Sequence, residues 1–241
     1  MLTTLRVLTA EALGTFFLCF AGIAAILCTA PPINSGGGLV AIALAHGLAL
    51  SIAVNNFGGI SGAHVNPAVT MGMLVTRRIT APLALLYIVA QLLGGSIAAI
   101  ACREIFPAEA VNAAMLGIPL PAAWAGPGTV FCVEAILTFL LVTSVFGTAV
   151  DERGKTVKIG GFAIGLTVAF DILAGGPVTG ASMNPARSFG PALVMGHWQG
   201  HWLYWVGPIV GGCAAALLYH HFLLVAPEKP LVKEERLDKG R

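Results

Sequence analysis

The triplet Asn-Pro-Ala occurs twice in this chain, and each copy opens a short apolar run. The first copy stands in the segment Ser-Gly-Ala-His-Val-Asn-Pro-Ala-Val-Thr at 61–70, and the second in Thr-Gly-Ala-Ser-Met-Asn-Pro-Ala-Arg-Ser at 179–188. Asparagine is a preferred helix N-cap and proline is favoured in the first turn, so helices are predicted to begin at Pro67 and Pro185. Both starts lie in strongly apolar surroundings. We therefore expect the positive ends of two helices in the protein interior.

The composition places these helix starts in a membrane protein. Of the 241 residues, 57% are hydrophobic and 10% are charged, whereas about 25% of the residues of a soluble domain are charged. The net charge of +2 comes from residues clustered in a few short stretches, so no nucleic-acid surface is expected. Five cysteines are scattered through apolar segments without the spacing of metal ligands, and we interpret them as small buried hydrophobic residues. No metal site, cofactor or enzymatic activity is predicted.

Six apolar stretches are long enough to cross a bilayer, which takes about 20 helical residues. Two further apolar runs, at 67–75 and 185–195, follow the Asn-Pro-Ala triplets and are too short to cross, so they are predicted to be re-entrant half-helices. The expected fold class is an all-α membrane protein with six transmembrane helices and two half-helices. The six predicted spans are 8–30, 39–57, 81–101, 130–150, 159–176 and 202–225.

The basic residues indicate how the chain is oriented in the membrane. Arg77 and Arg78 follow the first half-helix, and Arg153 and Lys155 follow the fourth span, whereas the outer loops hold almost no basic residues. Cytoplasmic loops carry the excess of lysine and arginine, so both termini are predicted to be cytoplasmic. The first apolar stretch is too long for a signal peptide and is expected to be retained. The polar, charged segment 226–241 is predicted to be a cytoplasmic tail.

The two halves of the chain repeat each other at an offset of about 118 residues. Glu11 corresponds to Glu134, the segment 45–48 to 163–166, and 87–91 to 204–208. Each half contains three spans, and this odd number makes the second half insert upside down. We therefore predict a single membrane domain over 1–241, built from inverted repeats at about 8–101 and 130–225, with the two half-helices meeting near the midplane.

The two asparagines are the central candidates for a binding site. The side-chain amides of Asn66 and Asn184 offer N–H donors, and the dipoles of two half-helices make the region positive. A small neutral molecule such as water can accept those bonds, whereas a cation meets an unfavourable potential and a proton relay is interrupted. The plainer alternative is a pair of capped turns that only pack together. The acceptors expected along a narrow pore are the backbone carbonyls of Gly62, Ala63, His64, Gly180, Ala181 and Ser182.

Three basic or imidazole side chains lie near these turns inside apolar segments. Arg187 follows Asn184 by three residues, and an intramembrane arginine is costly and usually functional. It is predicted to bond loop carbonyls, to project into the pore, or to do both. His46, in the second span, either lines a pore or is a satisfied core residue. His64 is expected at the cytoplasmic mouth, with support of the backbone alone as the alternative.

Three acidic residues fall within the predicted spans. Glu11 and Glu134 are symmetry mates, and a buried carboxylate must be hydrogen-bonded or neutral. We predict that these two residues brace the re-entrant loops rather than carry protons. Asp171 has no acidic mate, because Ala53 holds the corresponding position. It either braces loop residues or tunes the charge of His46.

These features together resemble the aquaporin (major intrinsic protein) family. The resemblance rests on the two Asn-Pro-Ala triplets, the run Arg-Ser-Phe-Gly-Pro-Ala at 187–192 and the duplicated three-span units, and it covers about residues 8–225. It implies a homotetramer in a lipid bilayer, with one pore in each protomer and with water and small neutral solutes as partners. The pore-motif residues that it implies are Asn66, Pro67, Ala68, Asn184, Pro185 and Ala186.

The family has an outer aromatic/arginine filter of four positions, which map onto His46, Ile172, Ala181 and Arg187. Water-selective members usually resemble Phe-His-Cys/Thr-Arg there, so His46 replaces an aromatic residue and Ile172 replaces a histidine. This quartet resembles that of the tonoplast intrinsic proteins of plants and of the ammonia-permeable animal members. The resemblance implies a passive channel for water and ammonia that excludes protons and ions, with hydrogen peroxide and urea as further candidate solutes.

Alternative functions stay open at this point. Glycerol facilitators usually carry Asp where this chain has Ala192 and an aliphatic residue where it has Trp205, so both positions here are similar to water channels. An ion-coupled secondary transporter also uses inverted repeats and broken helices, but it needs an ion-coupling site. A junction or adhesion protein on the same fold is disfavoured by the short outer loops. The expected location is a plasma or inner membrane, with an intracellular membrane such as that of a vacuole as the alternative.

Overall fold

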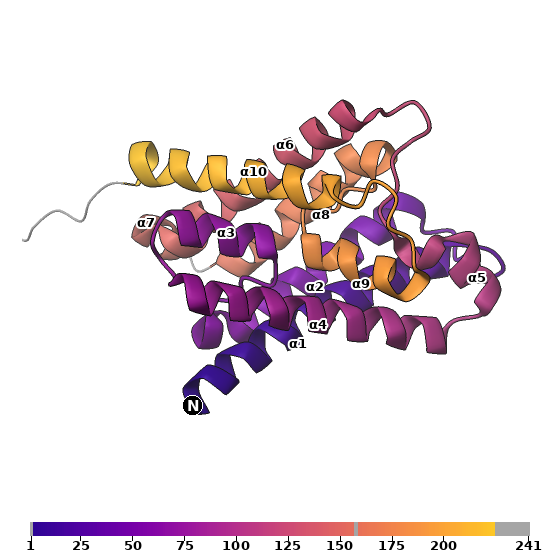
Figure 1. The fold of residues 1–241 in the computed structure, drawn as a ribbon, viewed down its shortest axis with the longest axis horizontal. Coiled ribbons are helices and arrows are strands. Elements are labelled where there is room, and N and C mark those ends of the chain that lie inside the picture. Colours follow the sequence, from indigo (N-terminus) through magenta and orange to yellow (C-terminus); the bar gives the residue numbers. More distant parts are fainter. Residues whose placement is uncertain (1, 157–158, 225–241) are drawn as a thin grey trace, which may run out of the picture.

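The computed structural model describes residues 2–156 and 159–224, whose helices lie side by side along one long axis (Figure 1). Within these residues, six helices are long and apolar enough to cross a membrane, so the predicted all-α fold is confirmed. The predicted tail at 226–241 lies outside the described residues. The six helices are α1 (Leu2–Thr29), α2 (Gly38–Ser61), α4 (Ala81–Ile105), α6 (Pro127–Val145, continued by η2, Phe146–Val150), α8 (Gly160–Thr179) and α10 (Leu203–Leu218, continued by η3, Tyr219–Leu223).

Two short helices begin in the middle of the molecule and run in opposite directions, as Figure 1 shows. They are α3 (Pro67–Val75) and α9 (Pro185–Met195), and their bounds are those predicted from the sequence. At 1.5 Å per residue, nine and eleven residues reach about 14 to 17 Å, roughly half of a bilayer's apolar core. Helix α9 ends at Gly196, whose φ of 67° is the left-handed conformation that glycine adopts most easily.

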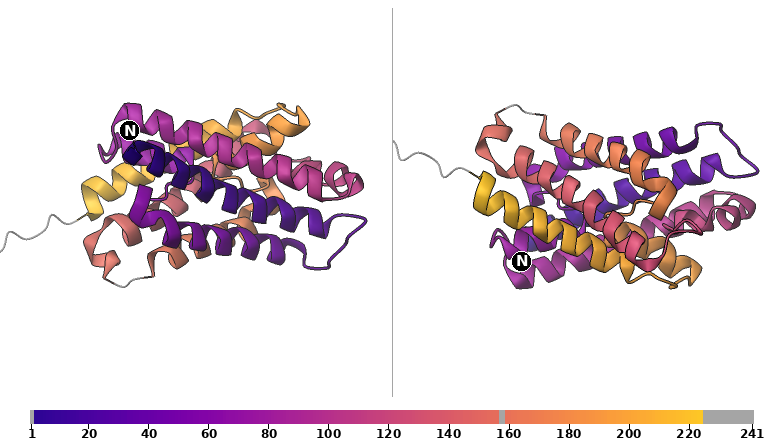
Figure 2. Two further views of the ribbon diagram at one scale, coloured as in Figure 1. Left: turned by 90° about the horizontal axis from the view of Figure 1, so that it is seen from below. Right: turned by 90° about the horizontal axis from the view of Figure 1, so that it is seen from above.

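The long helices pack closely because small residues lie where they cross. In the first half α1 packs against α2 and α4, and in the second half α6 packs against α8 and α10 (Figure 2). A Cβ atom at Gly94 of α4 would overlap the backbone carbonyl of Ala12, and one at Gly211 of α10 would overlap that of Ala135. Gly94 and Gly211 occupy equivalent positions in the two halves, and so do Ala12 and Ala135. Small residues at such crossings let helix backbones approach within a membrane.

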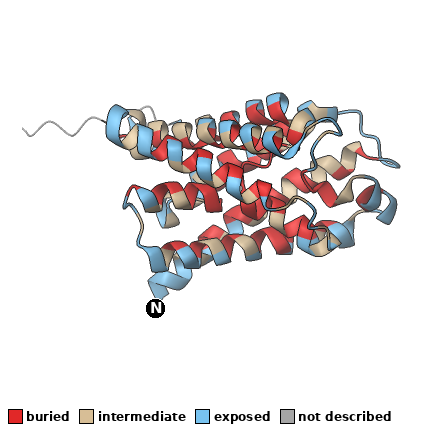
Figure 3. Cartoon of the chain, turned by 45° about the horizontal axis from the view of Figure 1, so that its top comes forward, coloured by how far each residue is buried: buried red, intermediate tan, exposed pale blue. Residues whose placement is uncertain are grey.

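Buried residues run through the middle of the molecule (Figure 3), and many large apolar side chains are exposed on its outside. Each half-helix packs mainly on a long helix of the other half, α3 on α10 and α9 on α4. One outer stripe of α2 repeats every four residues and consists of exposed Val40, Leu44, Leu48 and Ile52. An apolar exterior around a core that holds polar residues is what a bilayer requires of a spanning protein.

Three short elements lie in the connections and were not predicted. Helix α5 (Ala108–Ala113) and the turn η1 (Met115–Gly117) follow α4, and α7 (Glu152–Lys155) follows η2. In η1, Leu116 has a φ of 51°, so this turn is held in a left-handed conformation that is uncommon for leucine. The turn matters because it brings the carbonyl of Gly117 to the interior.

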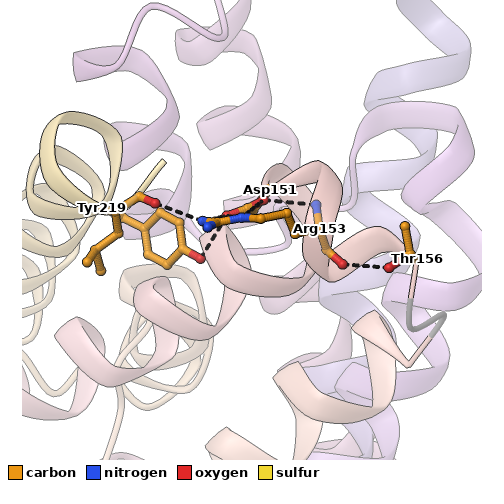
Figure 4. Close-up of polar contacts among 5 residues, drawn as sticks. Asp151, Arg153, Thr156 and Tyr219 are labelled. Carbon is orange, nitrogen blue, oxygen red and sulfur yellow. Dashed lines mark hydrogen bonds and ion pairs between the residues drawn. The ribbon is translucent and has the colours of Figure 1, made fainter. Parts of the chain in front are cut away.

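The connection after η2 is tied to the end of the last span by a polar cluster (Figure 4). Asp151 accepts hydrogen bonds from the guanidinium of Arg153, at 3.0 Å from Nε, and from the hydroxyl of Tyr219, at 3.2 Å. Arg153 also donates from Nη2 to the backbone carbonyl of Leu223, at 2.8 Å. We call Asp151, Arg153, Tyr219 and Leu223 the terminal latch. It joins the start of α7 to η3 at the end of the molecule where α1 begins.

Candidate functional site

The N-termini of the two half-helices meet at the centre of the protein. Asn66 caps α3 by accepting from the backbone N–H of Ala68 at 2.8 Å, and Asn184 caps α9 by accepting from that of Ala186 at 2.9 Å. Proline follows each asparagine, so the first helical residue has no N–H to satisfy. The two positive helix ends therefore face one region of the interior.

Each asparagine also holds the loop that precedes the other. The side-chain amide of Asn66 donates to the carbonyl of Met183 at 2.8 Å, and that of Asn184 donates to the carbonyl of Val65 at 2.9 Å. A side-chain amide has two N–H donors, and this contact uses one of them. The second donor of each amide is left for another acceptor, and both side chains line the cavity described below.

The loops before the asparagines are held in an unusual backbone conformation. Ala63 and Val65 have φ values of 46° and 56°, and the equivalent Ala181 and Met183 have 46° and 55°. For residues other than glycine this region is rarely populated and costs roughly 1–3 kcal/mol each. Such a conformation persists only if the surroundings hold it in place.

Glu11 holds the first loop. Its Oε1 accepts from the hydroxyl of Ser61 at 2.6 Å and the N–H of His64 at 2.9 Å, and its Oε2 accepts from the N–H of Val65 at 2.7 Å and the amide of Gln91 at 2.8 Å. The carboxyl group is fully buried. Four donors supply what a buried carboxylate needs in place of water.

Glu134 holds the second loop in the same way, with one donor fewer. Its Oε1 accepts from the hydroxyl of Thr179 at 2.7 Å and the N–H of Ser182 at 2.9 Å, and its Oε2 accepts from the N–H of Met183 at 2.8 Å. Pro208 stands where the sequence repeat places the mate of Gln91, and it has no side-chain donor. The two buried glutamates, which we call the braces, therefore differ in the number of donors that they accept from.

A cavity runs past both asparagines, and its wall is mostly apolar. Of the residues selected from the sequence, the wall includes both asparagines, all four predicted filter residues and part of the two loops. Pro67, Ala68, Pro185, Ala186, Gly180, Glu11 and Glu134 lie outside the wall, at the helix starts, at the turn or behind the loops. The selected residues in the wall are His46, Gly62, Ala63, His64, Asn66, Ile172, Ala181, Ser182, Asn184 and Arg187.

The rest of the cavity wall consists of apolar residues that were not selected from the sequence. Ile164 and Val168 of α8 recur at helical spacing with the selected Ile172, because one face of the helix turns to the cavity. This helical spacing could have indicated the apolar wall residues from the sequence, although a stripe of lipid-facing residues shows the same period. The other apolar wall residues are Leu18, Leu50, Val54, Val69, Leu141, Val145 and Met183.

Arg187 is buried at 3% exposure and reaches from α9 toward the turn η1. Its Nη1 donates to the carbonyl of Gly117 at 2.6 Å. Its Nε has no hydrogen-bond partner within the described part of the chain. The guanidinium is therefore fixed by a loop carbonyl and keeps a donor that a molecule in the cavity can use.

The orientation of the His46 ring is fixed by two neighbours. Its Nδ1 lies 2.8 Å from the carbonyl of Ile42, and because a carbonyl only accepts, Nδ1 carries the hydrogen. Nε2 is then an acceptor, and it has no partner among the described residues. A Cβ atom at Gly22 of α1 would overlap the imidazole, so the ring occupies the space that this glycine leaves.

A similar argument fixes His64 at the other end of the cavity. Thr70 donates its single hydroxyl hydrogen to the carbonyl of Asn66 at 3.0 Å and accepts from Gln91 at 3.0 Å. The contact of 3.1 Å between Nδ1 of His64 and the Thr70 hydroxyl therefore needs the hydrogen on Nδ1. His64 is half-buried, and its Nε2 is left as an acceptor.

The electrostatic character of the cavity follows from these parts. Arg187 and the two helix N-termini supply positive potential, and the carboxylates of Glu11 and Glu134 are turned away to the loop N–H groups. The described residues contain no group of three or more His, Cys, Asp or Glu side chains that could hold a metal ion. The arrangement suits a neutral molecule that accepts from the asparagines and the arginine.

Comparisons with known proteins agree with this geometry. Residues 1–219 match the family described as Major intrinsic protein. The chain is 42% identical to Aquaporin TIP4-4 of Zea mays, over 95% of this chain and 92% of that protein. It is 42% identical to Aquaporin TIP2-1 of Arabidopsis thaliana, over 94% and 91%. The X-ray structure of the aquaglyceroporin from Plasmodium falciparum has the same fold, with a TM-score of 0.83 and 24% identity over 91% of this chain and 97% of that one.

Proposed function

The chain belongs to the major intrinsic protein family, and we propose that this aquaporin-type channel conducts water and ammonia through the cavity between the two Asn-Pro-Ala turns. The observation that carries the proposal is the wall itself, in which Asn66, Asn184 and Arg187 are buried donors among apolar side chains. Water and ammonia both accept hydrogen bonds and are both neutral. The protein is a multi-pass membrane protein, and no enzymatic step is needed for this transport.

Proton exclusion is ascribed to the meeting of the two half-helices. Each asparagine keeps one amide N–H after bonding the opposite loop, so a water molecule between them accepts two bonds through its oxygen. Its hydrogens then point away along the pore, and a relay of hydrogen bonds through the centre is interrupted. The positive helix ends raise the energy of a cation at the same place.

The choice among neutral solutes is ascribed to the outer quartet. Ile172 offers no hydrogen bond, Ala181 is small, His46 adds a polar ring, and Arg187 adds a guanidinium whose Nε has no partner among the described residues. Ammonia and urea carry both donors and acceptors, so they can bond to polar groups of either kind. Hydrogen peroxide has the same two capacities. Glycerol is the competing solute to be tested, since it is larger and richer in hydroxyl groups.

Location and assembly are part of the proposal. Basic residues on the side of both termini support a cytoplasmic position for these ends. The resemblance to tonoplast intrinsic proteins favours an intracellular membrane of the vacuole type where the source cell has one, and the cell membrane where it has none. The family resemblance supports a homotetramer, which cross-linking in native membranes tests directly.

Stopped-flow light scattering on proteoliposomes tests the channel. Fast osmotic shrinkage with a low activation energy is expected, and permeability equal to that of empty vesicles contradicts the proposal. A panel of water, ammonia, urea, glycerol and hydrogen peroxide on the same vesicles then decides the solute. Glycerol flux as high as that of ammonia would indicate a glycerol-type facilitator. Transport that requires an ion gradient would indicate a secondary transporter.

A further inference from the structure

Asp171 is a buried acid that neither the pore nor the braces explain. It lies in α8 with 0% exposure, and neither of its carboxyl oxygens has a hydrogen-bond partner among the described residues. Glu11 and Glu134, the other fully buried acids of the spans, accept bonds from four and three donors respectively. Asp171 therefore lacks the donors that a buried carboxylate needs in place of water.

The position of Asp171 on α8 places it behind the pore wall. Ile164, Val168 and Ile172 of the same helix line the cavity, and a Cβ atom at Gly175 would overlap the side chain of Leu137 of α6. Asp171 precedes Gly175 by four residues, so both lie on one face of the helix, the face toward α6. Asp171 itself does not line the cavity, whereas the next residue, Ile172, does.

The elements around Asp171 supply no positive charge. Helix α8 packs against α2, α6 and η2, all of which lie within the described residues. Their titratable side chains are His46 on α2 and Cys132 and Glu134 on α6. The Nδ1–H of His46 is used by the carbonyl of Ile42, and Arg187 donates to Gly117 in the outer connection. The nearest formal charge on a packed helix is thus the negative one of Glu134.

An isolated carboxylate in such surroundings binds a proton rather than remain charged, because its desolvation is not repaid by a partner. We propose that Asp171 is a proton-binding site behind the wall of the pore and is carried as a neutral carboxylic acid. Because the bound proton neutralises the carboxylate of Asp171, this residue places no negative charge near the part of the pore that excludes cations. The site differs from both braces, which remain hydrogen-bonded carboxylates.

The bound proton has a consequence for selectivity, and this consequence rests on the proposed channel function. Asp171 is the residue before the cavity-lining Ile172. If it were ionised, its negative charge would offset the positive potential of Arg187 and of the helix ends. Ammonium and potassium would then be excluded less well, while neutral solutes would be unaffected. Asp171 acts here through its field and touches no solute.

Infrared spectroscopy on the purified, reconstituted protein tests the proton directly. The carbonyl stretch of a protonated carboxylic acid is resolved from the carboxylate and amide bands. At neutral pH the wild-type protein is expected to show this band, and Asp171→Asn, which has the same shape without an ionisable group, is expected to lose it. Asp151→Asn, which removes a carboxylate of the terminal latch, is the matched control and is expected to keep it.

Two results overturn the proposal, namely a wild-type spectrum without the band, or a band that Asp171→Asn retains. If Asp171→Asn does not insert, Asp171→Ala takes its place in the same comparison. Water permeability that is absent while the band is present would contradict the channel function and leave the proton site standing. In vesicles, wild-type potassium leak is expected to rise several-fold at alkaline pH and that of Asp171→Asn to stay low. Equal leak from both at alkaline pH overturns the assigned role in selectivity.

Discussion

The side-chain amide of Asn184 donates a hydrogen bond to the backbone carbonyl of Val65, at 2.9 Å across 119 positions of the chain. Asn66 makes the reciprocal bond to the carbonyl of Met183 at 2.8 Å. Each asparagine therefore caps its own half-helix and fixes the loop that leads to the other. Because one side chain does both, the half-helices cannot be displaced separately without loss of both contacts.

Replacing Asn184 by alanine is expected to destabilise the protein and to weaken proton exclusion. The change removes an N-cap and leaves the buried carbonyl of Val65 with only the longer contact to the Thr15 hydroxyl, at 3.4 Å, which together cost about 2–4 kcal/mol. Thermal unfolding in detergent measures the stability, and a pH-sensitive dye inside proteoliposomes measures the proton leak. Asn112→Ala, at an exposed position of α5, is the control and should change neither. Unaltered stability of Asn184→Ala would show that the crossed bond contributes little.

The two braces are expected to respond unequally to the change from glutamate to glutamine. In Glu11→Gln the new amide group faces either two donors on Oε1 or two on Oε2, so at least two buried donors lose their acceptor. In Glu134→Gln the amide can replace Oε2, where one N–H, that of Met183, is lost. Each unsatisfied donor costs about 1–3 kcal/mol, so Glu11→Gln should unfold at the lower temperature.

The comparison of the two variants is its own control, because both remove one negative charge at equivalent places in the repeat. Equal melting temperatures would show that the number of donors does not set the strength of the brace. A double variant that adds Gln91→Leu to Glu11→Gln removes one of the competing donors and is expected to recover part of the loss.

The sequence predicted the parts of this structure that depend on local chemistry. The bounds of α3 and α9 followed from Asn66-Pro67 and Asn184-Pro185, because a cap and a proline fix where a helix begins whatever the tertiary context. The six spans followed from length and hydrophobicity alone. Helix α1 nevertheless begins at Leu2 rather than at residue 8, because the mixed segment 2–7, which contains Arg6, continues the helix although it is too polar to be counted in an apolar span.

The contacts that shape the site depend on tertiary packing and were not predictable. The carbonyl of Gly117 that holds Arg187 comes from the turn η1, which has no periodic pattern and contains Leu116 in a left-handed conformation. The space for the His46 ring comes from Gly22 on a different helix, and a glycine in an apolar span gives no sign of what it faces. Sequence spacing alone also could not separate the apolar wall residues from the lipid-facing ones.

Adding one methyl group at Gly22 is expected to disturb the outer quartet. A Cβ atom there would overlap the His46 imidazole, so in Gly22→Ala the ring must move or α1 must shift. We expect altered ammonia and urea flux relative to water, and a loss of stability of about 1–3 kcal/mol from overpacking. Gly59→Ala in α2 has open space around the new methyl group and serves as the control. Identical solute ratios in Gly22→Ala and wild type would show that His46 does not set them.

The terminal latch is expected to hold the end of the last span at neutral pH. The guanidinium of Arg153 beside Asp151 holds the pKa of that carboxyl group well below its usual range. A group with a lowered folded-state pKa contributes stability above its ordinary pKa of 3.8, and that contribution is lost as the pH falls through the lower folded-state pKa. The latch should therefore be intact at neutral pH and weaken only in strong acid.

Hydrogen exchange measures the latch through the backbone amide of Leu224, which donates to the carbonyl of Tyr219 at 2.8 Å. Arg153→Ala is expected to speed this exchange at neutral pH, and high salt should do so in part, because the Arg153 side chain is 60% exposed. Lys155→Ala, which removes an exposed ion pair with Glu152 three residues away, should leave the rate unchanged. Equal rates in all three proteins would mean that the latch does not order the end of the span.

Changing the side chains at two of the predicted filter positions is expected to lower ammonia and urea flux while water flux is kept. The double variant His46→Phe with Ile172→His removes the acceptor beside Gly22 and places a polar ring on the part of the wall that α8 contributes. Ammonia and urea flux should fall about ten-fold or more, the effect of one lost hydrogen bond in an apolar wall, while water flux stays within the same range. The control is Leu44→Phe with Leu173→Phe, which lie at exposed positions of the same two helices and should leave both fluxes unchanged. Water flux through the double variant His46→Phe with Ile172→His shows whether the channel is folded. If its ratios of ammonia and urea flux to water flux equal those of the wild type, the selectivity belongs to another part of the pore.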